Sequence, residues 1–112
     1  MISYDNKTFR SCSNSLTGEV DGNTIFHYRQ EKNIVTGTYS GGKILSGQLI
    51  ALVDQQGRLD MRYQHINQDG DLMTGKCIST PVLLPTGKLR IHEVWEWTSG
   101  DLSAGESLIE EL

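Results

Sequence analysis

The sequence has only two cysteines, two prolines and no long apolar run. Cys12 and Cys77 show neither a CxxC motif nor any other metal-ligand spacing, which favours two free, partly buried thiols over a single disulfide. No stretch approaches the roughly 18 consecutive apolar residues that indicate a membrane-spanning helix. The N-terminal MISYDNKTFR lacks the basic and apolar regions of a secretory signal, so we expect a cytoplasmic protein without a membrane partner.

Basic residues are also scarce, with 10 Lys and Arg against 14 Asp and Glu and a formal net charge of −4. Nucleic-acid binding requires a clustered basic face, so this composition argues against a nucleic-acid partner. Neither GxGxxG nor GxxxxGK[ST] occurs, and there is no HExxH motif. His27, His65 and His92 fall on different predicted strands. We therefore expect no bound metal and no cofactor.

Turn signals, by contrast, recur at short intervals along the chain. DG at 21–22 and 69–70 and GG at 41–42 supply the positive φ angles of tight hairpins. The segments between the turns are rich in β-branched and aromatic residues, which favour strands. They predict strands at 7–13, 23–30, 33–40, 43–54, 58–67, 71–80, 87–98 and 104–111.

Eight strands with mostly short connections predict an all-β protein, with residues 1–112 forming one domain and an antiparallel up-and-down meander. An open meander would expose two long edges, so we expect a small closed barrel, with a two-sheet sandwich as the alternative. Glycines inside strands, such as Gly47 and Gly75, suit the strong coiling of a barrel. Pro81 and Pro85 predict a rim loop or a bulged strand end.

The last segment carries two conflicting signals. Ser103 and Glu106 match a capping box, which would start a C-terminal helix. Gly105 and the near alternation of Leu108, Glu110 and Leu112 favour a strand. We expect the strand at 104–111, because a helix would leave seven strands and a plug.

Alternation assigns the two faces of the strands. In 58–67 the inward residues are Leu59, Met61, Tyr63 and His65. In 87–98 they are Leu89, Ile91, Glu93, Trp95 and Trp97. The segment 43–54 is apolar on both faces over residues 49–53, which predicts an outer face covered by a second subunit or by a loop.

The predicted interior holds polar groups that a filled core would not choose. Small-molecule sites combine aromatic walls with a few convergent polar groups. We therefore predict a binding module for a small, partly apolar ligand, at a site formed by Tyr39, Tyr63, His65, Glu93, Trp95 and Trp97. A ligand with a basic or hydroxyl group would suit a buried Glu93.

Three alternatives remain open at the sequence level. Glu93 would have a purely structural role if an Arg or Lys of a neighbouring strand neutralised it. Glu93 and His65 would form an acid–base pair if the protein were an enzyme. The barrel would be filled and act through a homo-oligomer interface if the tryptophans and tyrosines only packed a core.

Four stretches carry a resemblance: IFHYRQ at 25–30, LIALVDQQGRLDMRYQHIN at 49–67, LMTGKCISTP at 72–81, and LRIHEVWEWTSGD at 89–101 continued by GES at 105–107 and IEE at 109–111. Together they are similar to a family of small bacterial proteins, and the resemblance implies an avidin-like or lipocalin-like antiparallel barrel. Members of this family are often labelled as related to N-acetylglutamate synthase, which implies acetyl transfer as another function. The sequence lacks the [RQ]xxGx[GA] loop that binds the pyrophosphate of acetyl-CoA in the common acetyltransferase fold.

Overall fold

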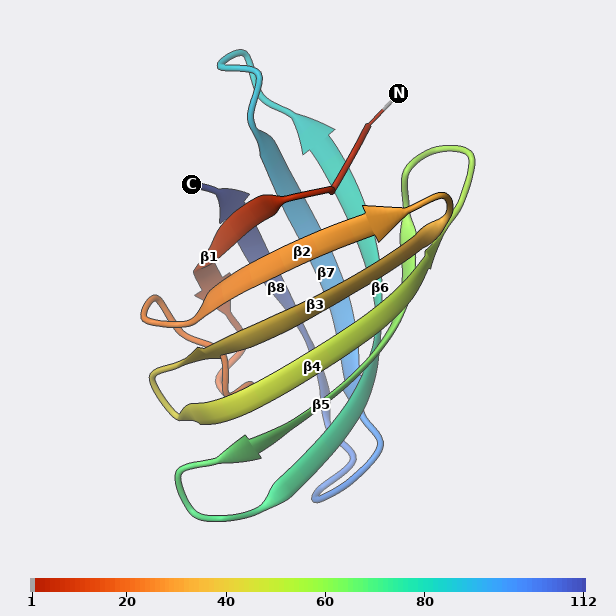
Figure 1. The fold of residues 1–112 in the computed structure, drawn as a ribbon. Helices are drawn as coiled ribbons and strands as arrows, with labels where there is room; N and C mark the ends of the chain where they lie inside the picture. The colour runs from red at the N-terminus through yellow and green to blue at the C-terminus, as the bar shows by residue number, and fades with distance from the viewer. Residues whose placement is uncertain (1) are drawn as a thin grey trace.

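The fold is a closed barrel of eight antiparallel strands. The computed structural model describes residues 2–112 and pairs each strand with the next, while the last strand returns to the first (Figure 1). The strands are β1 (Lys7–Asn14), β2 (Ile25–Glu31), β3 (Ile34–Gly41), β4 (Ile44–Val53), β5 (Leu59–Asn67), β6 (Leu72–Leu83), β7 (Leu89–Trp97) and β8 (Ala104–Glu111). The predicted fold class is confirmed. Among the described residues, no helix is long and apolar enough to cross a membrane.

The strand bounds agree with the sequence prediction to within two residues, except at the end of β6. This strand continues through Pro81 to Leu83, and Pro81 pairs with Ile91 of β7 in regular register. Pairing of β6 with β5 ends at Ser79. Beyond Ser79 the strand has a neighbour on one side only, where a proline is tolerated. The prediction of a rim loop or a bulge is therefore wrong for residues 81–83.

The C-terminal segment is a strand, as predicted, and it closes the barrel. β8 pairs with β7 on one side and with β1 on the other. A helix starting at Ser103 would leave the facing edges of β1 and β7 unpaired, so sheet closure outweighs the capping-box signal. Glu106 instead lies on the outer face, where its Oε1 is 3.2 Å from Nε2 of His92.

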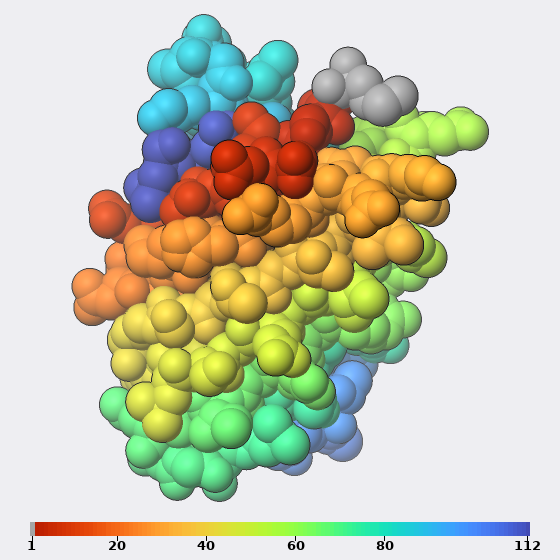
Figure 2. All heavy atoms as spheres, in the orientation of Figure 1, coloured from red at the N-terminus to blue at the C-terminus, as the bar shows by residue number. Residues whose placement is uncertain are grey.

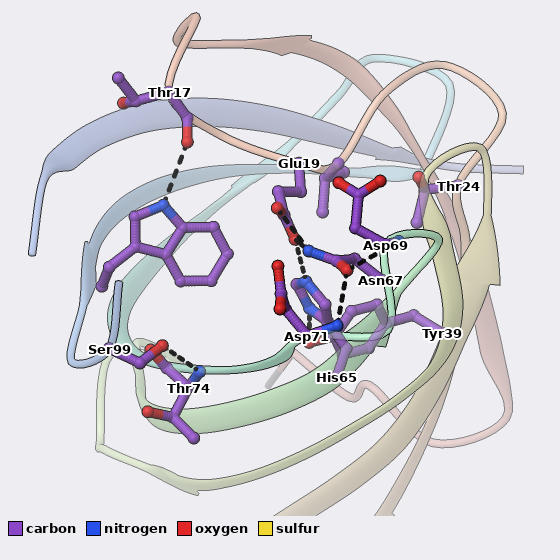
Figure 3. A network of polar contacts seen from close by, with 12 residues as sticks. Thr17, Glu19, Thr24, Tyr39, His65, Asn67, Asp69, Asp71, Thr74 and Ser99 are labelled. Carbon is purple, nitrogen blue, oxygen red and sulfur yellow. Dashed lines mark hydrogen bonds and ion pairs between the residues drawn. The ribbon is translucent and has the colours of Figure 1, made fainter. Parts of the chain in front are cut away.

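The N-terminal segment closes one end of the barrel. Tyr4 is fully buried, its hydroxyl donates a hydrogen bond to the carbonyl of Gly57, and its backbone N–H donates to Oε1 of Gln30 at 2.9 Å. The Tyr4 ring packs against Tyr28, with 6.1 Å between the centroids. At the opposite end, which we call the mouth, the chain between β1 and β2 crosses the opening (Figure 3).

The outer face of β3 and β4 carries an apolar patch. Ile34 is 45 % exposed, and Ile50 and Leu52 are each 57 % exposed. Ile34 pairs directly with Leu52, and Figure 2 shows the two strands as adjacent bands on this surface. Because these side chains remain exposed, no loop within residues 2–112 covers them, and the prediction of cover by a loop is wrong. Cover by a second subunit stays a prediction.

Three inward aromatic rings lie on glycines of the neighbouring strand. The cross-strand pairs are Tyr39 with Gly47, Tyr63 with Gly75, and Trp95 with Gly105. A Cβ atom built on any of these glycines would overlap the ring of its partner. The missing side chain therefore lets each ring lie close to the sheet, which leaves room at the centre of the barrel.

We expect Gly75→Ala to destabilise the protein by about 1–3 kcal/mol, because the new methyl group forces the Tyr63 ring towards the interior. Urea denaturation measures the change. Gly22→Ala is the matched control, since a Cβ there meets nothing within 4 Å, and its effect should stay within about 0.5 kcal/mol. Equal unfolding free energies for wild type and Gly75→Ala would contradict the steric role of this glycine.

Candidate functional site

A small cavity lies inside the barrel near the mouth. Its volume is about 50 Å³, which is room for roughly four water molecules. The six residues predicted from the sequence all lie on its wall, namely Tyr39, Tyr63, His65, Glu93, Trp95 and Trp97. The structure thus brings the whole predicted set together. That these residues bind a ligand stays a prediction.

Glu93 lies on the cavity wall without a cationic partner. Its Oε1 accepts a hydrogen bond from Ser107 at 3.0 Å, and its Oε2 accepts one from Ser79 at 3.4 Å. The thiol of Cys77 is 4.0 Å from Oε2. None of the ion pairs formed within residues 2–112 involves Glu93. The alternative that an Arg or Lys of a neighbouring strand neutralises it is therefore wrong.

The surroundings of Glu93 favour its neutral form. Burial raises its pKa from 4.5 to about 7, although the hydrogen bonds from Ser107 and Ser79 act in the opposite direction. Burial also raises the pKa of Tyr28 well above its ordinary value, with the Glu93 charge as the next cause. The Tyr28 hydroxyl is buried and has no hydrogen-bond partner among residues 2–112. This part of the interior therefore contains polar groups whose hydrogen-bonding capacity is only partly used.

Both cysteines are free, as predicted. Their burial differs from the prediction, since Cys12 is exposed and Cys77 is buried. Burial and the nearby Glu93 charge raise the pKa of Cys77. The thiol therefore stays neutral on the cavity wall.

His65 is buried between Tyr39 and the mouth. The Tyr39 hydroxyl is 2.9 Å from Nδ1 of His65, and Oε1 of Glu19 is 2.7 Å from Nε2 (Figure 3). Both ring nitrogens are thus occupied by partners other than Glu93. His65 and Glu93 therefore do not hydrogen-bond to each other, and a shared role of the two residues as acid and base stays a prediction.

The segment of residues 15–24, here called the mouth loop, lies over the cavity. The indole N–H of Trp97 donates to the carbonyl of Thr17 at 3.1 Å. Glu19 extends from the mouth loop into the opening, and Figure 3 shows its carboxylate contacting both His65 and Asn67. The Nδ2 of Asn67 donates to Oε2 of Glu19 at 3.0 Å. These contacts fasten the mouth loop to two strands of the barrel, β5 and β7.

The end of β1 adds a second anchor for the mouth loop. Oδ1 of Asn14 accepts a hydrogen bond from the indole N–H of Trp95 at 2.9 Å, and Nδ2 of Asn14 donates to the carbonyl of Val20 at 3.0 Å. Sequence reasoning missed Asn14 and Glu19, because neither shows the alternation that marks inward strand residues. The only signal was the length of the mouth loop, which exceeds that of a tight hairpin turn.

The remaining histidines contribute nothing to the cavity. His27 is exposed on β2, and His92 lies on the outer face of β7 beside Glu106. Within residues 2–112, no group of three or more His, Cys, Asp and Glu side chains is arranged to hold a metal ion. The arrangement is suited to holding a small molecule by hydrogen bonds and ring contacts.

The raised pKa of Glu93 predicts a pH-dependent stability. Between about pH 4.5 and about pH 7 the folded protein keeps the Glu93 proton that the unfolded chain releases, so stability falls as pH rises. The total loss should be on the order of 3 kcal/mol. Urea denaturation between pH 4.5 and pH 8 measures it, and Glu93→Gln should remove this decline.

Glu96→Gln is the matched control on the same strand, since Glu96 faces outward and is exposed. This variant should keep the full decline in stability. A Glu93→Gln protein that loses stability with pH as steeply as wild type would contradict the burial of an uncompensated carboxyl group.

Comparison with known proteins places this barrel in a family. No curated protein and no solved structure gives a significant match to the chain. The family model described as avidin-like protein matches residues 2–112, which is nearly the whole chain. The avidin-like resemblance noted in the sequence is confirmed, and none of the comparisons supports the N-acetylglutamate synthase label. The chain belongs to the avidin-like protein family.

Proposed function

We propose that this protein binds a small molecule in the cavity near the mouth of the barrel. The observation that carries the proposal is the buried Glu93 carboxyl, which lies on the cavity wall without a cation. Burying an ionisable group without a partner costs several kcal/mol, and such groups concentrate at functional sites. A filled barrel would be more stable with an apolar side chain at this position.

The walls of the cavity support the same proposal. The Trp95 and Trp97 rings are 5.7 Å apart between centroids, and the Tyr63 ring stands at 65° to that of Trp97. Rings held on glycines and fastened by hydrogen bonds form a preorganised apolar surface. Preorganisation reduces the entropy cost of binding.

The size of the cavity limits what enters while the mouth loop is in place. About 50 Å³ suits a molecule of only a few heavy atoms. A larger ligand requires the mouth loop to move away from His65 and Trp97. Acetyl transfer remains without support, because the described residues provide no helix N-terminus for a pyrophosphate.

A thermal-shift screen against small metabolites tests the proposal. A ligand present at 100 times its Kd should stabilise the native state by about 2.7 kcal/mol. Cys77→Met places two additional heavy atoms in the cavity and should abolish the shift. Lys76→Met introduces the same side chain on the outer face of the same strand and should keep the shift. A ligand that stabilises Cys77→Met as much as wild type would place binding outside the cavity and contradict the proposal.

Removing the Glu19 side chain should loosen the mouth loop. Glu19→Ala leaves Nε2 of His65 and Nδ2 of Asn67 without this partner. The closed position of the mouth loop should therefore be destabilised by about 1–3 kcal/mol. Acrylamide should then quench the fluorescence of Trp95 and Trp97 more strongly than in wild type. Glu31→Ala, at an exposed position at the other end of the barrel, is the control. Unchanged quenching in Glu19→Ala would show that Glu19 does not hold the loop.

A further inference from the structure

The cavity wall is acidic, and no Lys or Arg among residues 2–112 lines it. Its carboxylates are Glu19 at the mouth and Glu93 in the interior. Glu19 already contacts His65 and Asn67. Within residues 2–112, the polar contacts of Glu93 are with the hydroxyls of Ser79 and Ser107 and the thiol of Cys77, which are all neutral. A positive charge entering the cavity would therefore find an uncompensated carboxyl group.

Aromatic rings surround the space next to this carboxyl group. The rings on the wall belong to Phe26, Tyr39, Tyr63, Trp95 and Trp97. The face of an aromatic ring is negative and attracts cations, most strongly in Trp, and the attraction is larger in a desolvated site. The rings and the carboxyl group therefore both favour a positively charged ligand. An anionic ligand would meet repulsion from both, and a neutral ligand would leave the charge of the carboxylate uncompensated.

We propose, as a refinement that rests on the proposed binding function, that the ligand of this cavity is a small organic cation with a primary, secondary or tertiary ammonium group. The ammonium group donates to the Glu93 carboxylate, and the carbon substituents contact the Trp95 and Trp97 rings. With the mouth loop closed, the volume of about 50 Å³ admits an alkylammonium ion of roughly four heavy atoms.

Such a ligand binds with a characteristic pH dependence. Burial raises the pKa of Tyr28, Tyr39, Tyr63 and Cys77, so these neighbours stay neutral. His65 and Glu19 contact each other at the mouth and form the other titratable pair on the wall. Glu93, with its pKa at about 7, ionises between pH 6 and pH 8. The affinity for an alkylammonium ion should therefore rise about tenfold over this range.

An NMR titration tests this inference with two probes of equal size. Isopropylammonium chloride carries the charge, and 2-propanol is its neutral counterpart. The readout is the pair of indole N–H signals, which report on the cavity because Trp95 and Trp97 are the only tryptophans in the chain. We expect saturable shifts for the cation with at least tenfold higher affinity than for the alcohol at pH 8, at ionic strength matched with NaCl.

Glu93→Gln should lower the affinity for isopropylammonium at least tenfold and leave that for 2-propanol unchanged, whereas Glu96→Gln should change neither. The comparison of the two probes in wild type, and its pH dependence, test the inference even if Glu93→Gln fails to fold. Equal affinities for the two probes would overturn the cation inference. The proposed function would still stand if a neutral or anionic metabolite bound in the screen above, and it would fall only if no small molecule bound.

Discussion

The fixed width of an eight-stranded barrel determines which side chains its interior can hold. Three of the large rings fit because the neighbouring strand has no side chain opposite them, at Gly47, Gly75 and Gly105. The rings are thereby held close to the sheet instead of meeting at the centre. A space of about 50 Å³ remains between them, and Glu93 lies on its wall. The cavity thus follows from the register of glycines against aromatic residues.

The interior also has an asymmetric distribution of charge. Near the N-terminal end the barrel is packed with apolar side chains and closed by Tyr4. Near the mouth, the Glu19 carboxylate contacts both His65 and Asn67. Deeper in the interior, Glu93 accepts hydrogen bonds from the hydroxyls of Ser79 and Ser107 and has no cationic partner within residues 2–112. A buried carboxyl group with no cation is costly in a resting protein. It becomes favourable when a ligand supplies the missing charge, which links the stability of the fold to its proposed function.

Much of this arrangement could be predicted from the sequence, because alternation and turn spacing are local signals. They placed Tyr63, His65, Glu93 and the tryptophans on the inward face and counted the strands correctly. The partner of His65 was not predictable, since Glu19 belongs to a loop whose path depends on the closed barrel. The extension of β6 past Pro81 was also missed, because only the register shows that β5 has ended there. Local patterns assign faces, whereas partners across the barrel require the three-dimensional fold.

The most direct measurement is the titration of the Glu93 side-chain carboxyl by ¹³C NMR in the ligand-free protein, assigned with Glu93→Gln. We expect a midpoint near pH 7, because the group is buried without a cation, and a lower midpoint when a cationic ligand is bound. A midpoint near the ordinary value of 4.5 in the free protein would contradict the burial of an uncompensated carboxyl group. It would mean that solvent or a cation already stabilises the charge, and the cavity would then have no uncompensated group for a ligand to satisfy.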